Sequence, residues 1–161
     1  MIIANRRTGA TIIECAAATL KEAVEYARKQ GIQLLLNARG TEDLELAGAL
    51  GCGAQISRTL LMRLDQRPAL ACVGASCHDP VSLRRAESLG CDFALLSPVL
   101  PTLTHPDAPP LGWSGFSLLR ACTSLPVYAL GGVGPGDVAD AREAGAQGVA
   151  GIRGFFAGDA V

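Results

Sequence analysis

The chain repeats one short pattern four times, and this repeat limits the folds open to it. Each time an alanine stands four residues before a glycine and a short, continuously apolar stretch follows; the four segments are Ala27–Gly31, Ala47–Gly51, Ala86–Gly90 and Ala141–Gly145. A glycine directly after a helix adopts the left-handed conformation without steric cost, so each segment predicts the end of a helix. Continuous rather than alternating apolar residues indicate strands that are buried on both faces. The repeat therefore predicts a parallel sheet covered by helices.

The rest of the chain follows the same alternation of strands and helices. Helix starts agree with it, because Asp79-Pro80 has the sequence of an N-cap before a first-turn proline, and Gly134-Pro135 followed by Asp137 repeats the arrangement. Strands are expected at 11–15, 32–36, 54–57, 70–75, 93–97, 126–130 and 148–152, and helices at 20–30, 42–50, 58–66, 80–89, 114–122 and 135–144. Seven strands in this order predict a (β/α) barrel of the TIM type or an open doubly wound sheet. The barrel is favoured because polar residues follow nearly every strand, whereas an open sheet concentrates its site at one switch point.

The length of the chain bounds this architecture. With 161 residues, 49% of them hydrophobic, the chain is expected to form one domain over residues 1–161 with a substantial core. A complete eight-stranded barrel usually takes roughly 200 residues or more. We therefore expect a barrel that lacks its first β/α unit and has about seven parallel strands, with residues 1–4 as a remnant strand in a hairpin with 11–15. Its two unpaired sheet edges leave a homodimer open.

Charge and hydropathy exclude several kinds of partner. A formal net charge of -1 gives no overall field that would attract nucleic acid or an anionic membrane. No apolar run reaches the roughly 18 residues of a membrane span, and the basic pair near the N-terminus follows its apolar residues instead of preceding them as in a secretory signal. The protein is accordingly interpreted as cytoplasmic. The six cysteines are scattered without a Cys-x-x-Cys spacing, so they are predicted to be reduced core thiols, and no metal ligands are assigned.

Residues that follow the last two expected strands predict a phosphate site. Gly131 and Gly132 lie between a strand and a helix, where glycine lets backbone N–H groups and a helix N-terminus approach an anion. Ile152 and Arg153 end the last strand, and the loops after the last two strands commonly form one phosphate site in eight-fold barrels. We predict that these four residues bind a phosphate. The alternative is that the glycines only form a tight strand-to-helix turn.

The proline-rich loop at 97–112 is a second candidate. Thr102 and Thr104 predict ligand-binding hydroxyl groups, and His105 predicts a catalytic imidazole. The alternative is a solvated loop that is packed by its prolines.

Polar residues after two earlier strands complete the predicted site. Asn37 follows the strand at 32–36 and is a candidate for substrate binding, while Ser76 and His78 follow the strand at 70–75 and are further catalytic candidates. His78 equally fits a hydrogen bond to the cap of its own helix. Ser76 and His78 are neighbours in sequence only, so no catalytic triad is assigned.

These residues resemble the thiamine monophosphate synthase and TENI-type family, from residue 11 to residue 156, and most closely the version fused behind a Nudix (MutT-like) hydrolase. The most specific stretches are Leu34–Asn37, Ala75–Asp79, Leu96–Pro106, Pro126–Gly132 and Gly148–Arg153. The resemblance implies a TIM barrel and a transferase reaction of thiamine biosynthesis, in which a hydroxymethylpyrimidine diphosphate couples to a thiazole phosphate with loss of pyrophosphate. It also implies that the glycine turn and the end of the last strand hold the thiazole phosphate, and that the loop threonines handle the diphosphate.

Departures from the family pattern concern the diphosphate and its Mg²⁺ ion. The Gln-x-Arg-x-Lys of the family's second strand reads Ile13-Glu14-Cys15-Ala16-Ala17, the Asn-Asp pair after the third strand reads Asn37-Ala38, and the region after the fourth strand reads Ser57-Arg58-Thr59. The loop lysine of the family is His105, and the histidine of thiazole tautomerases aligns with Pro98. Since Mg²⁺ takes oxygen ligands, typically one or two carboxylates among them, it is expected only if synthase activity is retained.

Two main functions follow. The first is a thiamine phosphate synthase-like protein of thiamine biosynthesis or salvage, which binds a phosphorylated thiazole or thiamine-type ligand at the C-terminal face of the barrel and, if it is an enzyme, is a transferase. The second is a non-catalytic ligand-binding or accessory module of a Nudix-type protein. In both, the partner is a small phosphorylated ligand, thiazole phosphate or thiamine phosphate. A third interpretation, another phosphate-binding barrel enzyme such as an isomerase, depends on Glu14 as a strand-end acid.

Overall fold

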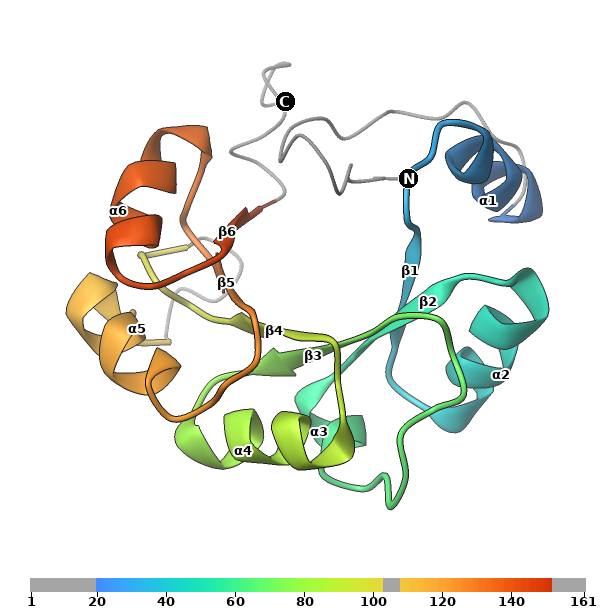
Figure 1. Ribbon diagram of the computed structural model, residues 1–161, viewed down its shortest axis with the longest axis horizontal. Helices are drawn as coiled ribbons and strands as arrows, with labels where there is room; N and C mark the ends of the chain where they lie inside the picture. Colours follow the sequence, from blue (N-terminus) through green and yellow to red (C-terminus); the bar gives the residue numbers. More distant parts are fainter. Residues whose placement is uncertain (1–19, 103–107, 152–161) are drawn as a thin grey trace.

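The computed structural model describes residues 20–102 and 108–151. Its elements, in chain order, are α1 (Leu20–Lys29), β1 (Leu35–Ala38), α2 (Thr41–Leu50), β2 (Gly53–Ile56), α3 (Arg58–Leu61), β3 (Val73–Cys77), α4 (Pro80–Leu89), β4 (Phe93–Leu96), α5 (Gly112–Arg120), β5 (Val127–Leu130), the 3-10 turn η1 (Pro135–Asp137), α6 (Val138–Glu143) and β6 (Gly148–Ala150). The strands pair in parallel and in chain order, from β1 to β6. Figure 1 shows a curved sheet with the helices on its outer, convex side. This α/β architecture is the predicted one, and chain-order pairing is that of a barrel rather than of a doubly wound sheet. The expected strand at 11–15 lies outside the described residues.

The four repeated segments all end their helices in the same way. Their glycines, Gly31, Gly51, Gly90 and Gly145, have φ of 67°, 64°, 79° and 89°. Each glycine donates its N–H to the carbonyl three residues earlier, and the residue after it donates to the carbonyl of the repeated alanine at 2.8 to 3.0 Å. These two bonds define a Schellman motif. The alanines are at most 1% exposed, so the last turn of each helix packs closely on the core.

The outer face of the sheet carries the main hydrophobic core. Val73, Ala75 and Cys77 alternate along β3, and all three are fully buried. They belong to one apolar cluster with helix residues such as Leu83 and Ala86 of α4. This layer between the sheet and its helices accounts for the buried apolar residues at alternate positions of the strand.

The concave face of the sheet carries aromatic and polar side chains around Gly74, which has no side chain. A Cβ atom on Gly74 of β3 would lie 2.2 Å from Oε1 of Gln55 and 2.3 Å from Cζ of Phe93. Phe93 in turn meets Tyr128 of β5 edge to face, with ring centroids 5.7 Å apart. Glycine at position 74 therefore leaves room for the Gln55 amide and the Phe93 ring inside the curved sheet.

The segment between α3 and β3 corrects two predicted boundaries. The helix expected over 58–66 ends at Leu61, and the strand expected to begin at residue 70 begins at Val73. Arg67 explains the difference, because its guanidinium donates to the Gly90 carbonyl at 2.8 Å and to the Leu70 carbonyl at 3.1 Å, and pairs with Asp92 at 2.7 Å. These bonds hold the chain in an irregular path across the amino-terminal ends of β3 and β4.

Two other boundaries differ for local reasons. The strand expected at 32–36 begins at Leu35, because Ile32 still donates its N–H to Ala27 in the helix-ending motif of α1. The helix expected over 135–144 begins as the 3-10 turn Pro135–Asp137 and continues as α6. The Asp137 side chain accepts the N–H of Gly134 and so caps this short helix start.

Three of the five cysteines in the described part of the chain are core residues. Cys52, Cys77 and Cys91 are buried free thiols, and Cys72 and Cys122 are half-buried. Burial raises the pKa of the Cys77 thiol to about 12 and that of Cys91 to about 11, so both stay protonated at neutral pH. The helices within 20–102 and 108–151 are all too short or too polar to cross a membrane.

Candidate functional site

The predicted site residues divide into two groups. Asn37, Ser76, His78, Thr102, Gly131 and Gly132 belong to the described part of the chain. Thr104, His105, Ile152 and Arg153 lie outside the described residues, and so does Glu14. The first group lies at or just after the carboxyl ends of strands, which is the edge where barrel enzymes build their sites.

The His78 ring joins the ends of β3 and β4. Its Nδ1 atom lies 2.8 Å from the carbonyl oxygen of Ser97 and 3.3 Å from the Ser97 hydroxyl. Because a carbonyl oxygen only accepts hydrogen bonds, Nδ1 carries the proton of the neutral ring and Nε2 is the acceptor. His78 is exposed at this edge.

The backbone of His78 contributes to the cap of α4, which was the alternative role for this residue. Its N–H donates to the Ser82 hydroxyl at 3.1 Å, and Ser82 donates its own N–H to Oδ1 of Asp79 at 2.7 Å. The backbone and the ring of His78 therefore have separate partners. The helix cap does not use the imidazole.

The loop after β4 is bonded directly to the double-glycine turn after β5. Val99 donates its N–H to the Leu130 carbonyl and Leu100 donates to the Gly131 carbonyl, both at 2.9 Å. The predicted proline-rich loop and the predicted glycine turn, which are far apart in sequence, thus form one structure at the carboxyl edge. Thr102 follows these anchored residues and is half-buried.

Gly131 and Gly132 are required by this contact. Their φ angles are 91° and 72°, in the left-handed region. A Cβ atom on Gly131 would lie 2.9 Å from Cα of Pro98, and one on Gly132 would lie 2.5 Å from the carbonyl oxygen of Pro101. Backbone meets backbone here, so the turn has a structural role whether or not it also binds an anion.

The start of the helix after this turn is already capped. Oδ2 of Asp137 accepts the N–H of Gly134 at 2.7 Å. A carboxylate at this position repels an anion that approaches the helix start. The turn at 131–132 is therefore better suited to an anion at this edge than the helix start, where Asp137 already accepts the Gly134 N–H.

Ser76 has a hydrogen-bond partner that the motif analysis did not identify. Nε2 of Gln55 in β2 donates to Oγ of Ser76 at 3.0 Å. Gln55 pairs with Asn37 of β1 in the strand register, and Asn37 is exposed. A glutamine inside a strand that is otherwise glycine, alanine and isoleucine was the available signal, because a polar residue in a short buried strand needs a reason.

The residues at the positions that the family resemblance assigns to Mg²⁺ do not fit this ion. Ala38 is buried and offers no donor, the Ser57 hydroxyl accepts the first-turn N–H of α3, and Arg58 pairs with Asp79 at 2.9 Å. Within 20–102 and 108–151, no three His, Cys, Asp or Glu side chains form a group that could hold a metal ion. Mg²⁺ takes carboxylate, carbonyl and water oxygens, so a guanidinium and an apolar methyl group are poor surroundings for it.

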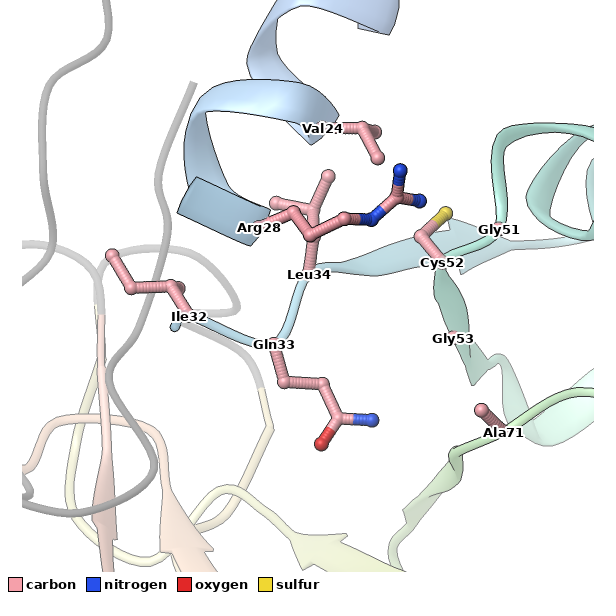
Figure 2. A pocket seen from close by; sticks show the side chains of 9 residues that line it. All are labelled: Val24, Arg28, Ile32, Gln33, Leu34, Gly51, Cys52, Gly53 and Ala71. Atoms are coloured by element: carbon pink, nitrogen blue, oxygen red, sulfur yellow. The ribbon is translucent and has the colours of Figure 1, made fainter. Parts of the chain in front are cut away.

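A pocket of about 160 Å³ lies at the opposite end of the strands. Figure 2 shows Arg28 and Cys52 beside Leu34, where β1 and β2 begin. The Arg28 guanidinium donates to the Leu50 carbonyl at 3.4 Å, and burial raises the pKa of the Cys52 thiol. The lining combines four aliphatic side chains with Arg28, Gln33, Cys52 and two glycines, and none of the predicted site residues contributes to it. We therefore place the candidate site at the carboxyl edge, where the polar side chains converge.

A family model and two relatives of known name agree on one protein family. The family model for thiamine monophosphate synthase matches residues 7–155. A thiamine-phosphate synthase of Chloroflexus aurantiacus is 30% identical over 152 residues, which cover 88% of this chain and 67% of that protein. A putative thiamine-phosphate synthase 2 of Aquifex aeolicus is 40% identical over 84 residues, which cover 52% of this chain and 45% of that protein. The matched region is therefore a little under half of the Aquifex protein and two thirds of the Chloroflexus protein.

A solved structure supports the fold. The thiamine phosphate pyrophosphorylase of Pyrococcus furiosus superposes with a TM-score of 0.61 and 21% identity, over 86% of this chain and 69% of that one. At this identity the likeness concerns the fold alone, and it agrees with a TIM-type α/β arrangement.

Proposed function

Because the chain belongs to the thiamine monophosphate synthase family, we propose that it binds a phosphorylated thiazole or thiamine-type ligand at the carboxyl edge of its sheet, as a synthase-like protein of thiamine biosynthesis or salvage. The observation that supports this most is the turn at Gly131 and Gly132. It presents main chain without side chains and is fixed in place by the loop after β4. Backbone N–H groups in such a turn are suited to phosphate oxygens.

Binding without turnover is a second candidate, favoured by the donor set at the ends of β1 and β2. Ala38, Ser57 and Arg58 provide no carboxylate for Mg²⁺, and Arg58 is neutralised by Asp79. A protein with this arrangement has a turn suited to phosphate, but these three positions offer no carboxylate that could bring Mg²⁺ to a diphosphate. This suits a ligand-binding or accessory module, and a Nudix-type hydrolase domain is the partner proposed for it.

Ligand-dependent stability tests the binding function. The melting temperature is measured with thiazole phosphate, thiamine phosphate, pyrophosphate and inorganic phosphate, each with and without Mg²⁺. A ligand at about 100 times its dissociation constant stabilises by roughly 2.7 kcal/mol, and each kcal/mol moves the midpoint by roughly 2 to 4 °C for a chain of this size. A rise of that size with thiazole or thiamine phosphate supports the proposal. No rise with any of the four compounds contradicts it.

Two glycine variants locate the binding. Gly132→Ala places a methyl group against the Pro101 carbonyl and should abolish the rise, whereas Gly31→Ala has a similar positive φ but open space around it and should keep the rise. Equal rises in the two variants would place the ligand elsewhere.

Incubation with hydroxymethylpyrimidine diphosphate, thiazole phosphate and Mg²⁺ separates the two candidate functions. Released pyrophosphate indicates the synthase, and the absence of pyrophosphate at high protein concentration indicates the non-catalytic module.

A further inference from the structure

The bond between Gln55 and Ser76 has a definite polarity. The Gln55 amide nitrogen donates to the Ser76 oxygen at 3.0 Å, while Oε1 of the same amide is buried and has no hydrogen-bond partner among the described residues. Oε1 occupies the space that Gly74 leaves open, against the Phe93 ring. A buried carbonyl oxygen without a partner costs free energy, so this unsatisfied atom needs an explanation, and the bond from the amide nitrogen to Ser76 offers one.

This polarity determines what the Ser76 hydroxyl can do. A hydroxyl that accepts a hydrogen bond from an amide nitrogen keeps its own proton free to donate. A nucleophilic serine needs the opposite arrangement, a base that accepts its proton. His78 does not supply that base in this structure, because the hydrogen bonds of its ring go to Ser97 and, among the described residues, none joins the ring to Ser76. Ser76 is therefore arranged as a hydrogen-bond donor.

The surroundings of Ser76 place this donor at the candidate site. Ser76 is half-buried near the carboxyl end of β3, two residues before His78 and therefore on the same face of the strand. Asn37, which pairs with Gln55 in the strand register, is exposed. Ser76 is thus partly exposed at the edge where the ligand is proposed, and Gln55 is its hydrogen-bond partner from the neighbouring strand.

We infer that Gln55 is a positioning residue that orients the Ser76 hydroxyl to donate to a hydrogen-bond acceptor of the ligand, a ring nitrogen or a phosphate oxygen. The inference rests on the proposed function for the presence of a ligand at this edge. Ser76 is accordingly a binding group rather than the catalytic nucleophile or base that the sequence suggested as one role for it.

Gln55→Glu tests the polarity through a pH profile. An ionised carboxylate only accepts hydrogen bonds, so it takes the Ser76 proton away from the ligand, whereas a protonated carboxyl group donates to Ser76 as the amide does. Partial burial favours the protonated form, which brings this titration into an accessible range. The dissociation constant of thiamine phosphate is measured for the variant and the parent between pH 5 and pH 8. The ratio of the two constants at each pH cancels the effect of the ligand's own titration.

The expected ratio is roughly 5 to 10 at pH 8, the effect of one hydrogen bond, and it falls towards one at pH 5. Gln147→Glu, an exposed residue before the amino-terminal end of β6, is the matched control and should stay near one throughout. The reverse profile, with the ratio rising at low pH, would mean that Ser76 donates to Gln55 and overturns the inference. A ratio above one that does not change with pH indicates only a packing role and overturns it as well.

A measurement without ligand separates this inference from the proposed function. If Nε2 of Gln55 donates to Oγ of Ser76, then Ser76→Ala shifts the side-chain amide proton resonances of Gln55, while Ser117→Ala on the exposed side of α5 leaves them in place. Unchanged Gln55 resonances in Ser76→Ala overturn the bond itself. If thiamine phosphate binds the parent and Gln55→Glu equally at all pH values, the proposed function stands and the positioning role fails.

Discussion

Asp79 connects two elements at the carboxyl edge of the sheet. Its Oδ1 atom accepts the N–H of Ser82 at 2.7 Å, and its Oδ2 atom pairs with Arg58 at 2.9 Å. Burial by itself raises the pKa of Asp79, but the hydrogen bonds from Ser82 and Arg58 outweigh it and hold the pKa below the ordinary value of 3.8. The ionised carboxylate is therefore the form that stabilises the fold.

Asp79→Ala should lower the free energy of unfolding by about 1 to 2 kcal/mol at pH 7, the usual cost of losing an N-cap. Because the folded pKa is depressed, this contribution is complete above the unfolded value and is lost as the pH falls through the folded value. The difference between parent and variant should therefore shrink below pH 3.8. Urea unfolding at several pH values measures it, with Asp65→Ala at an exposed loop position as the control. A difference that persists unchanged at acid pH would contradict this account.

Gly74→Ala should destabilise the fold by about 1 to 3 kcal/mol, because the new methyl group meets Gln55 and Phe93 at closer than contact distance. Gly48→Ala is the matched control. Its nearest neighbour would be the Leu70 side chain at 3.7 Å, and alanine in a helix is favoured over glycine by up to about 1 kcal/mol. Denaturant unfolding of both variants checks the prediction, and equal effects would show that the space above Gly74 is not filled.

At the scale of elements, the predictable features are those that depend on a few neighbouring residues. The Ala-x-x-x-Gly repeat predicted four helix ends, and Asp79-Pro80 predicted the start of α4, because capping is local. The early end of α3 was not predictable in this way. It depends on Arg67 reaching Gly90 and Asp92, which are more than twenty residues further along the chain.

The same division applies to the candidate site. The glycine turn and His78 could be proposed as candidates because they follow strands, but the contact between Gly132 and the loop carbonyl of Pro101 needs the fold. Gln55 was missed because its role depends on Ser76 in the neighbouring strand.

Arg67→Met should loosen the segment between α3 and β3. The substitution keeps the aliphatic stem but removes the bonds to the Gly90 and Leu70 carbonyls and the ion pair with Asp92, of which the carbonyl bonds contribute most because exposed ion pairs add little. We expect a loss of about 1 to 3 kcal/mol in unfolding free energy and faster proteolysis between residues 62 and 72. Arg63→Met, exposed in the same segment, should change neither. Equal proteolysis of the two variants would contradict the role given to Arg67.

For the whole molecule, burial predicts an unequal distribution of stability across the sheet. Four of the five residues of β3 are buried, whereas all three residues of β6 are only half-buried. Amide hydrogen exchange should therefore be slowest in β3 and β4 and fastest in β6 among the described strands. Native-state exchange followed by NMR measures this order. Equal protection in β3 and β6 would mean that the sheet opens only as a single unit.

The contact between the loop at 98–101 and the turn at 131–132 also matters for protein engineering. Since main chain fits against main chain there, the shape of this part of the edge is not set by side chains that can be exchanged one at a time. Grafting a loop from a relative onto this scaffold would succeed only if both segments were transplanted together. In this barrel the two loops form a single module, although about thirty residues of sequence separate them.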